Sequence, residues 1–159
     1  MATLPDTMAG REFLVYHGDG GSPQMANLVC GLQTNQFNQT KEINSTAVVP
    51  CDPPGGQPVN VSTAGAKSST VEGSGVFAKE KRAELQAAFD NANSETWAFV
   101  IKGEGYFWGN YHFQTYNIDG SGESDLGKIS VTLPNDGDWA WVTDLTAGNT
   151  TTFQLPASA

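Results

Sequence analysis

Most apolar residues of this chain recur at every second position, which is the period of a β-strand, and one stretch alone has the period of an α-helix. In residues 95–102, Trp97, Phe99 and Ile101 fall on one side of such a strand. Residues 78–93 instead repeat apolar side chains at three and four positions and are rich in Ala, Leu, Glu and Lys, which favour helix. Because the strands are not separated by further helices, we predict a mainly β fold, an antiparallel sandwich or barrel with one helix.

The strands are predicted from alternation bounded by turn residues. The first should be buried on both faces, because apolar side chains occupy both sets of alternate positions. The last two should form a hairpin around the turn at 119–125. The predicted strand segments are 11–17, 23–43 (a short apolar strand and then a polar one), 69–77, 95–102, 105–118 and 126–134.

Residues 44–70 break the pattern and are predicted to form a long protruding loop. They contain no aromatic residue, and "PCDPPGGQP" lies at their centre, at 50–58. Prolines remove backbone donors and paired glycines loosen the chain, so a regular strand cannot pass through 50–58. The flanking valines at 48–49 and 59–61 can pair as the arms of a hairpin. We predict one domain over 1–159, with arms at 1–10 and 143–159, the second of them flexible.

The charge balance argues against nucleic-acid recognition. Eight Lys and Arg against 17 Asp and Glu give a formal net charge of −9. Few cations are therefore present to displace the counterions of a phosphate backbone, and we expect no specific DNA binding. No apolar run approaches the length of a bilayer-spanning helix, and the start lacks the pattern of a signal peptide, so we expect no membrane insertion.

Catalytic groups are scarce, and we predict that the chain is neither an enzyme nor dependent on a cofactor. His17 and His112 are the only histidines, and common nucleophile, phosphate-loop and zinc motifs are absent. Asp136 and Asp138 form either a turn or a carboxylate pair, and Pro-Asn-Asp-Gly favours the turn. Cys30 and Cys51 are either free thiols or a single disulfide.

Eight aromatic residues lie on the predicted strands of the second half. They can form either sheet core and subunit contact or a platform on which sugars or bases stack, and alternation across paired strands favours the core. The residues are Trp97, Phe99, Tyr106, Phe107, Trp108, Tyr111, Phe113 and Tyr116.

Carboxylates gather in "NIDGSGESDLGK", at 117–128, at alternate positions that suggest a calcium loop. A loop of the EF-hand type starting at Asp119 needs glycine at its sixth position and glutamate at its twelfth. Ser124 and Ser130 stand there instead, and both flanks have the period of strands. We therefore predict no metal site, and assign Asp119, Glu123 and Asp125 to an acidic hairpin tip.

Four segments follow one another in a fixed order: "GREFLVYHGDGG", "LVCGLQTNQFNQTKEINST", "VEGSGVF" and "GNYHFQTYNIDGSGESDLGKISVTL". In this order they resemble the major tail tube protein family of long-tailed, siphovirus-type phages, which includes gene transfer agent tail tubes. The resemblance spans most of residues 10–133, and "CDPPGGQP" departs from the family pattern.

The resemblance implies a structural virion protein that forms hexameric rings, stacked into a tube through which DNA is delivered. It implies a tape measure protein in the lumen, tail terminator and distal tail proteins as further partners, and assembly in the host cytoplasm. The acidic tip would lie at the lumen or an interface. The ring-stacking loop would be formed by Pro50, Cys51, Asp52, Pro53, Pro54, Gly55 and Gly56.

Three alternatives remain open from the sequence. The chain could be a secreted or surface carbohydrate-binding β-sandwich, because its aromatic residues suit sugar stacking. It could be a small hydrolase on a β scaffold that uses His112 or Asp138. It could also be the tube protein of a contractile tail or a secretion-type injection system, because the tube proteins of those systems have a related fold.

Overall fold

The computed structural model describes Thr7, residues 12–120 and residues 127–156. The chain divides into two compact units where the sequence predicted a single domain. The larger unit comprises Met1–Phe37 and Thr70–Ala159, and the smaller unit comprises Asn38–Ser69. Two long strands, β3 (Leu32–Val48) and β4 (Val59–Val76), pass from one unit into the other.

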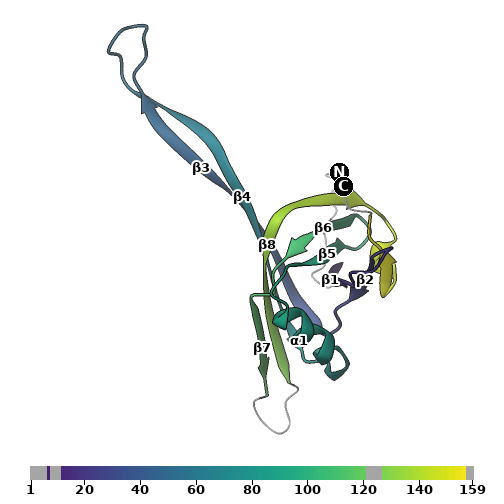
Figure 1. The fold of residues 1–159 in the computed structure, drawn as a ribbon. Helices are drawn as coiled ribbons and strands as arrows, with labels where there is room; N and C mark the ends of the chain where they lie inside the picture. The colour runs from purple at the N-terminus through teal and green to yellow at the C-terminus, as the bar shows by residue number, and fades with distance from the viewer. Residues whose placement is uncertain (1–6, 8–11, 121–126, 157–159) are drawn as a thin grey trace, which may run out of the picture. The chain divides into compact units, whose positions relative to one another are not determined.

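Antiparallel strands with one α-helix make up the described residues, which confirms the predicted fold class (Figure 1). Hydrogen bonds order the strands as β3-β4-β8-β6-β5-β1-β2-β9, and β7 also pairs with β8. The helix is preceded by a 3-10 turn at Lys79–Lys81 and is shorter than the predicted 78–93. The remaining elements are β1 (Phe13–Gly18), β2 (Met25–Leu28), α1 (Arg82–Asp90), β5 (Glu95–Ile101), β6 (Gly105–Tyr111), β7 (Thr115–Asp119), β8 (Lys128–Thr143), a 3-10 turn at Ala147–Asn149, and β9 (Thr152–Gln154).

The strands of the larger unit form two layers, and strand β8 belongs to both of them (Figure 1). Its first part, 128–134, pairs with β4 and β7, and its second part pairs with β6. Tyr111 lies opposite Asn135 and Gly109 opposite Trp139, so one residue of β6 faces three of β8. Gly137 has a φ of 92° within this bulge. The turn predicted at Asp136 and Asp138 is therefore wrong, because its Asn-Asp-Gly sequence bends a strand that continues.

The predicted strand at 105–118 is likewise two strands. Strand β6 pairs with β5 and the second part of β8, whereas β7 pairs with the first part of β8. Between them, the backbone N–H of His112 donates to Pro134 O and that of Gln114 donates to Thr132 O. The chain thus follows β8 across its bend, and β7 and β8 form the predicted final hairpin.

The main core fills the space between the two layers. Strands β3, β4, β8 and β7 form the four-stranded layer, and Val71, Val131 and Leu133 point from it into this core. Strands β1, β5 and β6 contribute Trp97, Phe99 and other apolar side chains from the opposite layer. Leu85 and Ala88, the buried residues of α1, close one side of the same cluster. Burying each large side chain stabilises the fold by about 2–3 kcal/mol.

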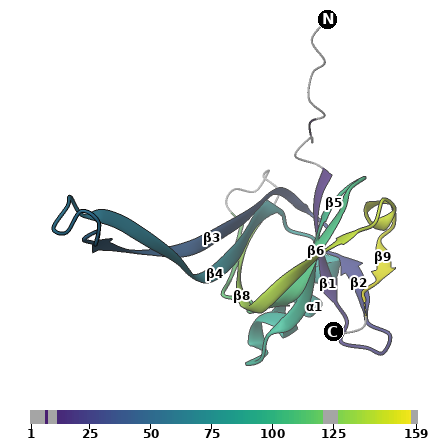
Figure 2. The same ribbon diagram turned by 90° about the horizontal axis from the view of Figure 1, so that it is seen from above.

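A second core lies on the other face of the β1-β5-β6 layer. Tyr16, Val100 and Tyr106 are buried there beneath the C-terminal segment, which contributes Leu155. Strand β9 pairs with β2 at the edge of this layer (Figure 2). The flexible arm predicted at 143–159 is therefore wrong for its described part, residues 143–156. Tyr16 Oη anchors this segment by donating to Thr150 O at 2.6 Å.

Two buried tyrosines predict that the fold weakens in alkaline solution. Burial, and then the Cys30 thiolate, raises the pKa of Tyr16. Burial, and then the Asp144 carboxylate, raises the pKa of Tyr106. Because these pKa values exceed the unfolded value of about 10, the two phenols contribute their full stability below that pH. That contribution is lost as pH rises through the folded-state pKa values.

We expect the urea midpoint of the natural chain to fall as the pH rises above about 10, the pKa of tyrosine in the unfolded chain. Replacing both residues (Tyr16→Phe with Tyr106→Phe) removes two of the three tyrosines whose pKa burial raises and should make this fall shallower. Tyr16→Phe also removes a hydrogen bond. An equally steep fall in the double variant would contradict the assignment to these phenols.

Candidate assembly surfaces

The four-stranded layer turns one face to the core and a polar face away from it. We name this second surface the polar face, and its rows follow from the strand register. Thr115, Thr132 and Glu72 lie opposite one another in one row, and Asn117, Ser130 and Ser74 in the next. Gln36 and Gln33 line the surface beside these two rows. No aromatic residue belongs to this set, so the polar face is built from small or flexible polar side chains.

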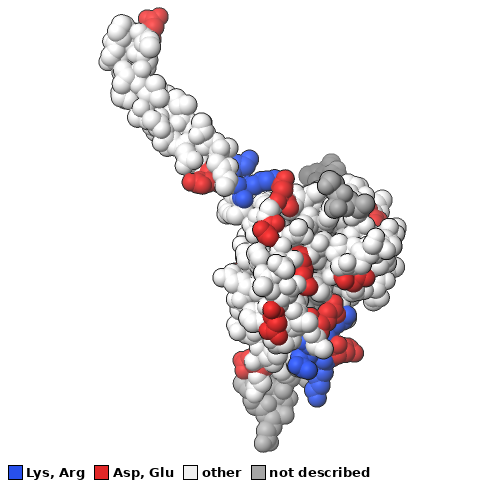
Figure 3. All heavy atoms as spheres, in the orientation of Figure 1, with Lys and Arg blue, Asp and Glu red and all other residues white. Residues whose placement is uncertain are grey.

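Charge on the polar face is low. Glu72 is exposed within it, and Asp119 lies opposite Lys128 at one end. Figure 3 shows acidic side chains spread over the visible side of the larger unit, whereas basic side chains are gathered in few places. The polar face thus lacks the cationic patch that would hold a phosphate backbone.

Two strand edges flank this layer. Strand β3 ends the hydrogen-bonded order, and β7 pairs with β8 alone among the described residues. An unpaired strand edge presents a row of free backbone N–H and C=O groups, which another strand can bind. The layer can therefore be extended at both sides by further copies of itself.

The smaller unit is a hairpin made from the later part of β3 and the first part of β4, which lie side by side in Figures 1 and 2. Thr40 Oγ1 and Ser68 Oγ are 2.8 Å apart across it. The long loop predicted over 44–70 is wrong except at its centre, because residues up to Val48 and from Val59 onward are strand. The prediction that the flanking valines form hairpin arms is confirmed for these two residues.

The predicted ring-stacking residues form the tip of this hairpin. Cys51 to Gly55 are exposed, and Pro50 and Gly56 are half-buried. The Gly56 N–H donates to Pro53 O at 3.1 Å and closes the turn. The strands beside the tip also expose large apolar side chains: Ile43, Val48, Val49, Val59 and Val61. An isolated two-stranded hairpin is marginally stable in water, so this surface is suited to being covered in an assembly.

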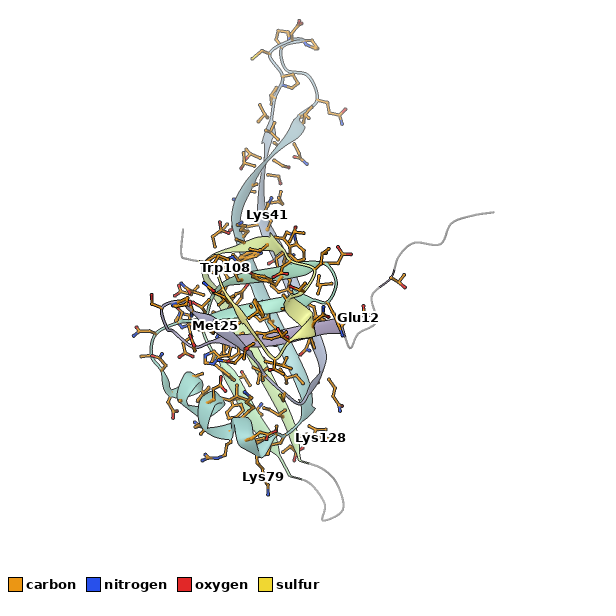
Figure 4. The ribbon with its side chains drawn as sticks, turned by 90° about the vertical axis from the view of Figure 1, so that its right-hand side faces the viewer. Glu12, Met25, Lys41, Lys79, Trp108 and Lys128 are labelled. Atoms are coloured by element: carbon orange, nitrogen blue, oxygen red, sulfur yellow. The ribbon has the colours of Figure 1, made fainter. Side chains whose placement is uncertain are left out.

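The acidic tip is only partly within the described residues. Asp119, the last residue of β7, is exposed and lies opposite Lys128. Figure 4 shows Lys79 and Lys128 at the end of the larger unit where the β7–β8 hairpin ends. Glu123 and Asp125 lie outside the described residues, so the assignment of this tip stays a prediction.

A profile of the phage tail tube protein family matches residues 7–140, which is most of the chain. The chain belongs to the phage tail tube protein family. The predicted resemblance is confirmed. No protein with a curated description matches the chain.

Solved structures share the fold of this tail tube protein. The tail of an empty gene transfer agent particle, refined with C6 symmetry, matches at a TM-score of 0.70 and 18% identity, covering 86% of this chain and 100% of the other. The SPP1 tail tube matches at a TM-score of 0.58 and 13% identity, covering 89% of this chain and 83% of the other. The cap of the anti-feeding prophage tube matches at a TM-score of 0.60 and 11% identity, covering 91% of this chain and 96% of the other.

Membership of a structural family confirms that this tail tube protein is a virion component and not an enzyme. His112 is exposed, and its Nε2 lies 3.5 Å from Asp136 Oδ2. Asp138 Oδ1 accepts a hydrogen bond from the backbone N–H of Trp139 at 2.8 Å and shapes the bulge of β8. His112 and Asp138, the residues considered for a hydrolase, therefore lie beside the bulge of this strand.

The other predictions on chemical groups have mixed outcomes. Cys30 and Cys51 are exposed free thiols, so the alternative of one disulfide does not hold. Trp97, Phe99, Tyr106 and Tyr111 are buried, as expected for sheet core. Across the described part of the chain, no cluster of three or more His, Cys, Asp or Glu could hold a metal. None of the helices described is long and apolar enough to cross a bilayer.

Sequence reasoning missed a hydrogen-bonded cluster around the buried His17. Its Nδ1 lies 3.0 Å from Glu84 Oε1 on α1, and its Nε2 lies 2.8 Å from Glu95 Oε2 on β5. The ring packs against Trp97 with 4.5 Å between centroids. This cluster fastens the helix to the sheet. No local pattern could reveal it, because the partners are 67 and 78 positions away in the chain.

Proposed function

We propose that this chain forms hexameric rings by joining its four-stranded layers edge to edge, and that the rings stack into the tail tube. Strand β7 of one copy would pair with β3 of the next, which leaves no strand edge open around the ring. The observation that carries the proposal is the presence of two edges on opposite sides of one layer. The family match and the C6 symmetry of the gene transfer agent tail support it.

The polar face would line the lumen. With six-fold symmetry, four strands from each copy make a barrel of 24 strands. At about 4.8 Å between strands its wall is about 115 Å around, and barrels of about 16–18 strands already leave an aqueous channel. A wall of hydroxyl and amide groups with a ring of Glu72 carboxylates would let DNA slide, because its one described cation, Lys128, lies opposite the Asp119 carboxylate.

The same proposal assigns the remaining partners. A tape measure protein would occupy the lumen before DNA passes, and tail terminator and distal tail proteins would bind the tube ends. Assembly would take place in the host cytoplasm. The Pro50–Gly56 tip would contact the adjacent ring. Asp119, Glu123 and Asp125 would lie at the lumen or meet the basic first turn of a neighbour's helix. Within one copy, Lys81 Nζ is 3.4 Å from Glu84 Oε2, so that turn is already partly neutralised.

Proline substitutions on β7 test ring closure. Successive residues of a strand point their N–H groups to opposite sides, so Asn117→Pro and Ile118→Pro remove donors from different sides of β7. We expect one variant to lose stability by breaking a bond to β8. The other should keep the monomer's thermal midpoint and lose rings and tubes in negative-stain electron microscopy.

Asn117→Thr keeps the backbone donor and is the matched control, which should assemble normally. Normal rings from a proline variant that remains folded would contradict pairing through this edge. Failure of the unaltered chain to form rings or tubes under any assembly condition would contradict the proposed function itself.

A further inference from the structure

His17 joins the helix α1 to the sheet through both nitrogens of its ring. It lies on β1 and is only 7% exposed. Its Nδ1 is 3.0 Å from Oε1 of Glu84 on α1, and its Nε2 is 2.8 Å from Oε2 of Glu95 on β5. We name these three residues the His17 cluster. The cluster connects three elements that are distant in the chain.

Hydrogen-bond chemistry fixes the number of protons that this geometry needs. A neutral imidazole has one N–H donor and one lone pair, whereas a carboxylate offers acceptors alone. Between two carboxylates, a neutral ring would therefore turn its lone pair toward one carboxylate oxygen, and the two atoms would repel each other. One added proton gives both contacts a donor. That proton belongs on the ring, because imidazole binds a proton more strongly than a carboxylate does.

A cavity of about 620 Å³ lies beside the His17 cluster, and its described lining includes Asp19 and both glutamates but no Lys or Arg. Asp19 Oδ1 accepts the backbone N–H of Gly21 at 2.8 Å and that of Met25 at 3.0 Å. These two bonds lower the pKa of the Asp19 carboxyl, which is therefore charged at neutral pH. Because Asp19 is exposed, water can enter the cavity and exchange protons with the cluster.

The two glutamates are held in place by further contacts. Lys81 Nζ, from the 3-10 turn before α1, is 3.4 Å from Glu84 Oε2. Asn91 Nδ2, just after α1, donates to Glu95 Oε1 at 3.3 Å. Each glutamate thus uses one carboxylate oxygen for His17 and the other for a second partner. The carboxylates cannot turn away from a neutral ring without losing these contacts.

We propose that the His17 cluster is a proton-dependent latch that holds α1 on the sheet. With the proton, the ring attracts both carboxylates and links α1 to β5. Without it, one of the two contacts is repulsive, and three carboxylates surround a neutral ring. Raising the pH removes the proton, so the population of molecules in which α1 is detached should rise. The latch acts within one copy and is independent of the proposed tube function.

Nuclear magnetic resonance tests the protonation directly. His17 and His112 are the only histidines, so His112→Gln assigns the ring signals of His17. The ¹⁵N shifts of the ring nitrogens distinguish the doubly protonated ring from its neutral forms. We expect both nitrogens of His17 to carry a proton at about pH 6 and one of them to lose it by about pH 9. A neutral His17 ring at about pH 6 would overturn the proposal.

Hydrogen exchange measures the latch itself. The full chain is kept below the concentration at which it assembles, and exchange of the amides at 82–90 is divided by the intrinsic rate at each pH. We expect this protection to fall by about tenfold or more between about pH 6 and about pH 9, since hydrogen bonds to charged groups are strong. His112→Gln and Glu80→Gln, which alter exposed residues, should show the same fall. Unchanged protection in the natural chain would contradict the latch.

Glu84→Gln separates the latch from a merely structural contact. The amide has the shape of the carboxylate and supplies a donor for Nδ1, so a neutral ring can accept there and donate from Nε2 to Glu95. We expect α1 of this variant to keep its protection at about pH 9. A fall like that of the natural chain, or low protection at both pH values, would overturn the proposal. If circular dichroism shows that this variant is unfolded, Glu95→Gln provides the same test from the other nitrogen.

Discussion

Replacing Pro50–Pro58 by Asn-Gly is expected to give a folded protein that no longer forms tubes. Asn-Gly suits a two-residue hairpin turn, so β3 and β4 can still pair after the replacement. The larger unit has its own two cores and contains none of the replaced residues. Tube assembly should fail because the exposed tip, which we propose contacts another copy, is missing.

Negative-stain electron microscopy and sedimentation measure the tubes, and circular dichroism checks the fold. We expect the sedimented fraction to fall at least tenfold. A nine-residue Gly-Ser replacement keeps the loop length and removes the prolines. It therefore distinguishes the effect of losing the proline side chains from the effect of shortening the loop. Normal tubes from both variants would show that the tip has no part in stacking.

The second large effect is expected from Gly75→Val, which should destabilise the larger unit by about 3 kcal/mol or more. A Cβ at this position would lie 2.7 Å from Gln33 N and 2.8 Å from Leu32 Cα, and nearer still to Gly31 O. All three are backbone atoms of residues 31–33, beside β4, so no side chain can move aside to relieve the clash. The pairing of β3 with β4 must separate there to admit a side chain.

Urea unfolding measures this effect, and Gly120→Ala is its matched control. A Cβ added at Gly120 would have no atom within 4 Å, so the free energy of unfolding of this variant should change by no more than about 0.5 kcal/mol. Gly73→Ala should be intermediate, because the nearest atom is Asn35 Oδ1 of a side chain, at 2.8 Å. Equal losses for Gly75→Val and Gly120→Ala would contradict the close approach of the two backbones.

The sequence predicts strands well where one face of the strand is buried, and poorly where both faces are exposed to solvent. Strand β5 was predicted almost to its ends, since Trp97 and Phe99 alternate toward the core. Within the hairpin from Asn38 to Ser69, the strand residues at 44–48 and 59–69 are predicted as loop, because their side chains are almost all exposed and leave no apolar alternation. Gly75 allows the close backbone approach described above, because a side chain there would meet backbone atoms of residues 31–33.

Long-range contacts account for most of what the sequence could not predict. Strand β9 is three residues long and has no strong pattern, yet it pairs with β2, more than 120 residues earlier. The bulge in β8 was read as a turn because Asn-Asp-Gly is typical of both. The groove beside Trp108 combines residues of β6, β8 and two distant loops, which are too far apart in the chain for local periodicity to indicate it.

The continuity of β8 has a mechanical consequence for a tube. If the four-stranded layers form the wall, a load that stretches or bends the wall acts on residues 128–134 of β8. The same backbone continues into the layer that holds β6, so the load passes along covalent bonds instead of through side-chain packing. The four-stranded layer and the layer that holds β6 would then deform together. The Asn135–Trp139 bulge is the point at which β8 bends from one layer into the other.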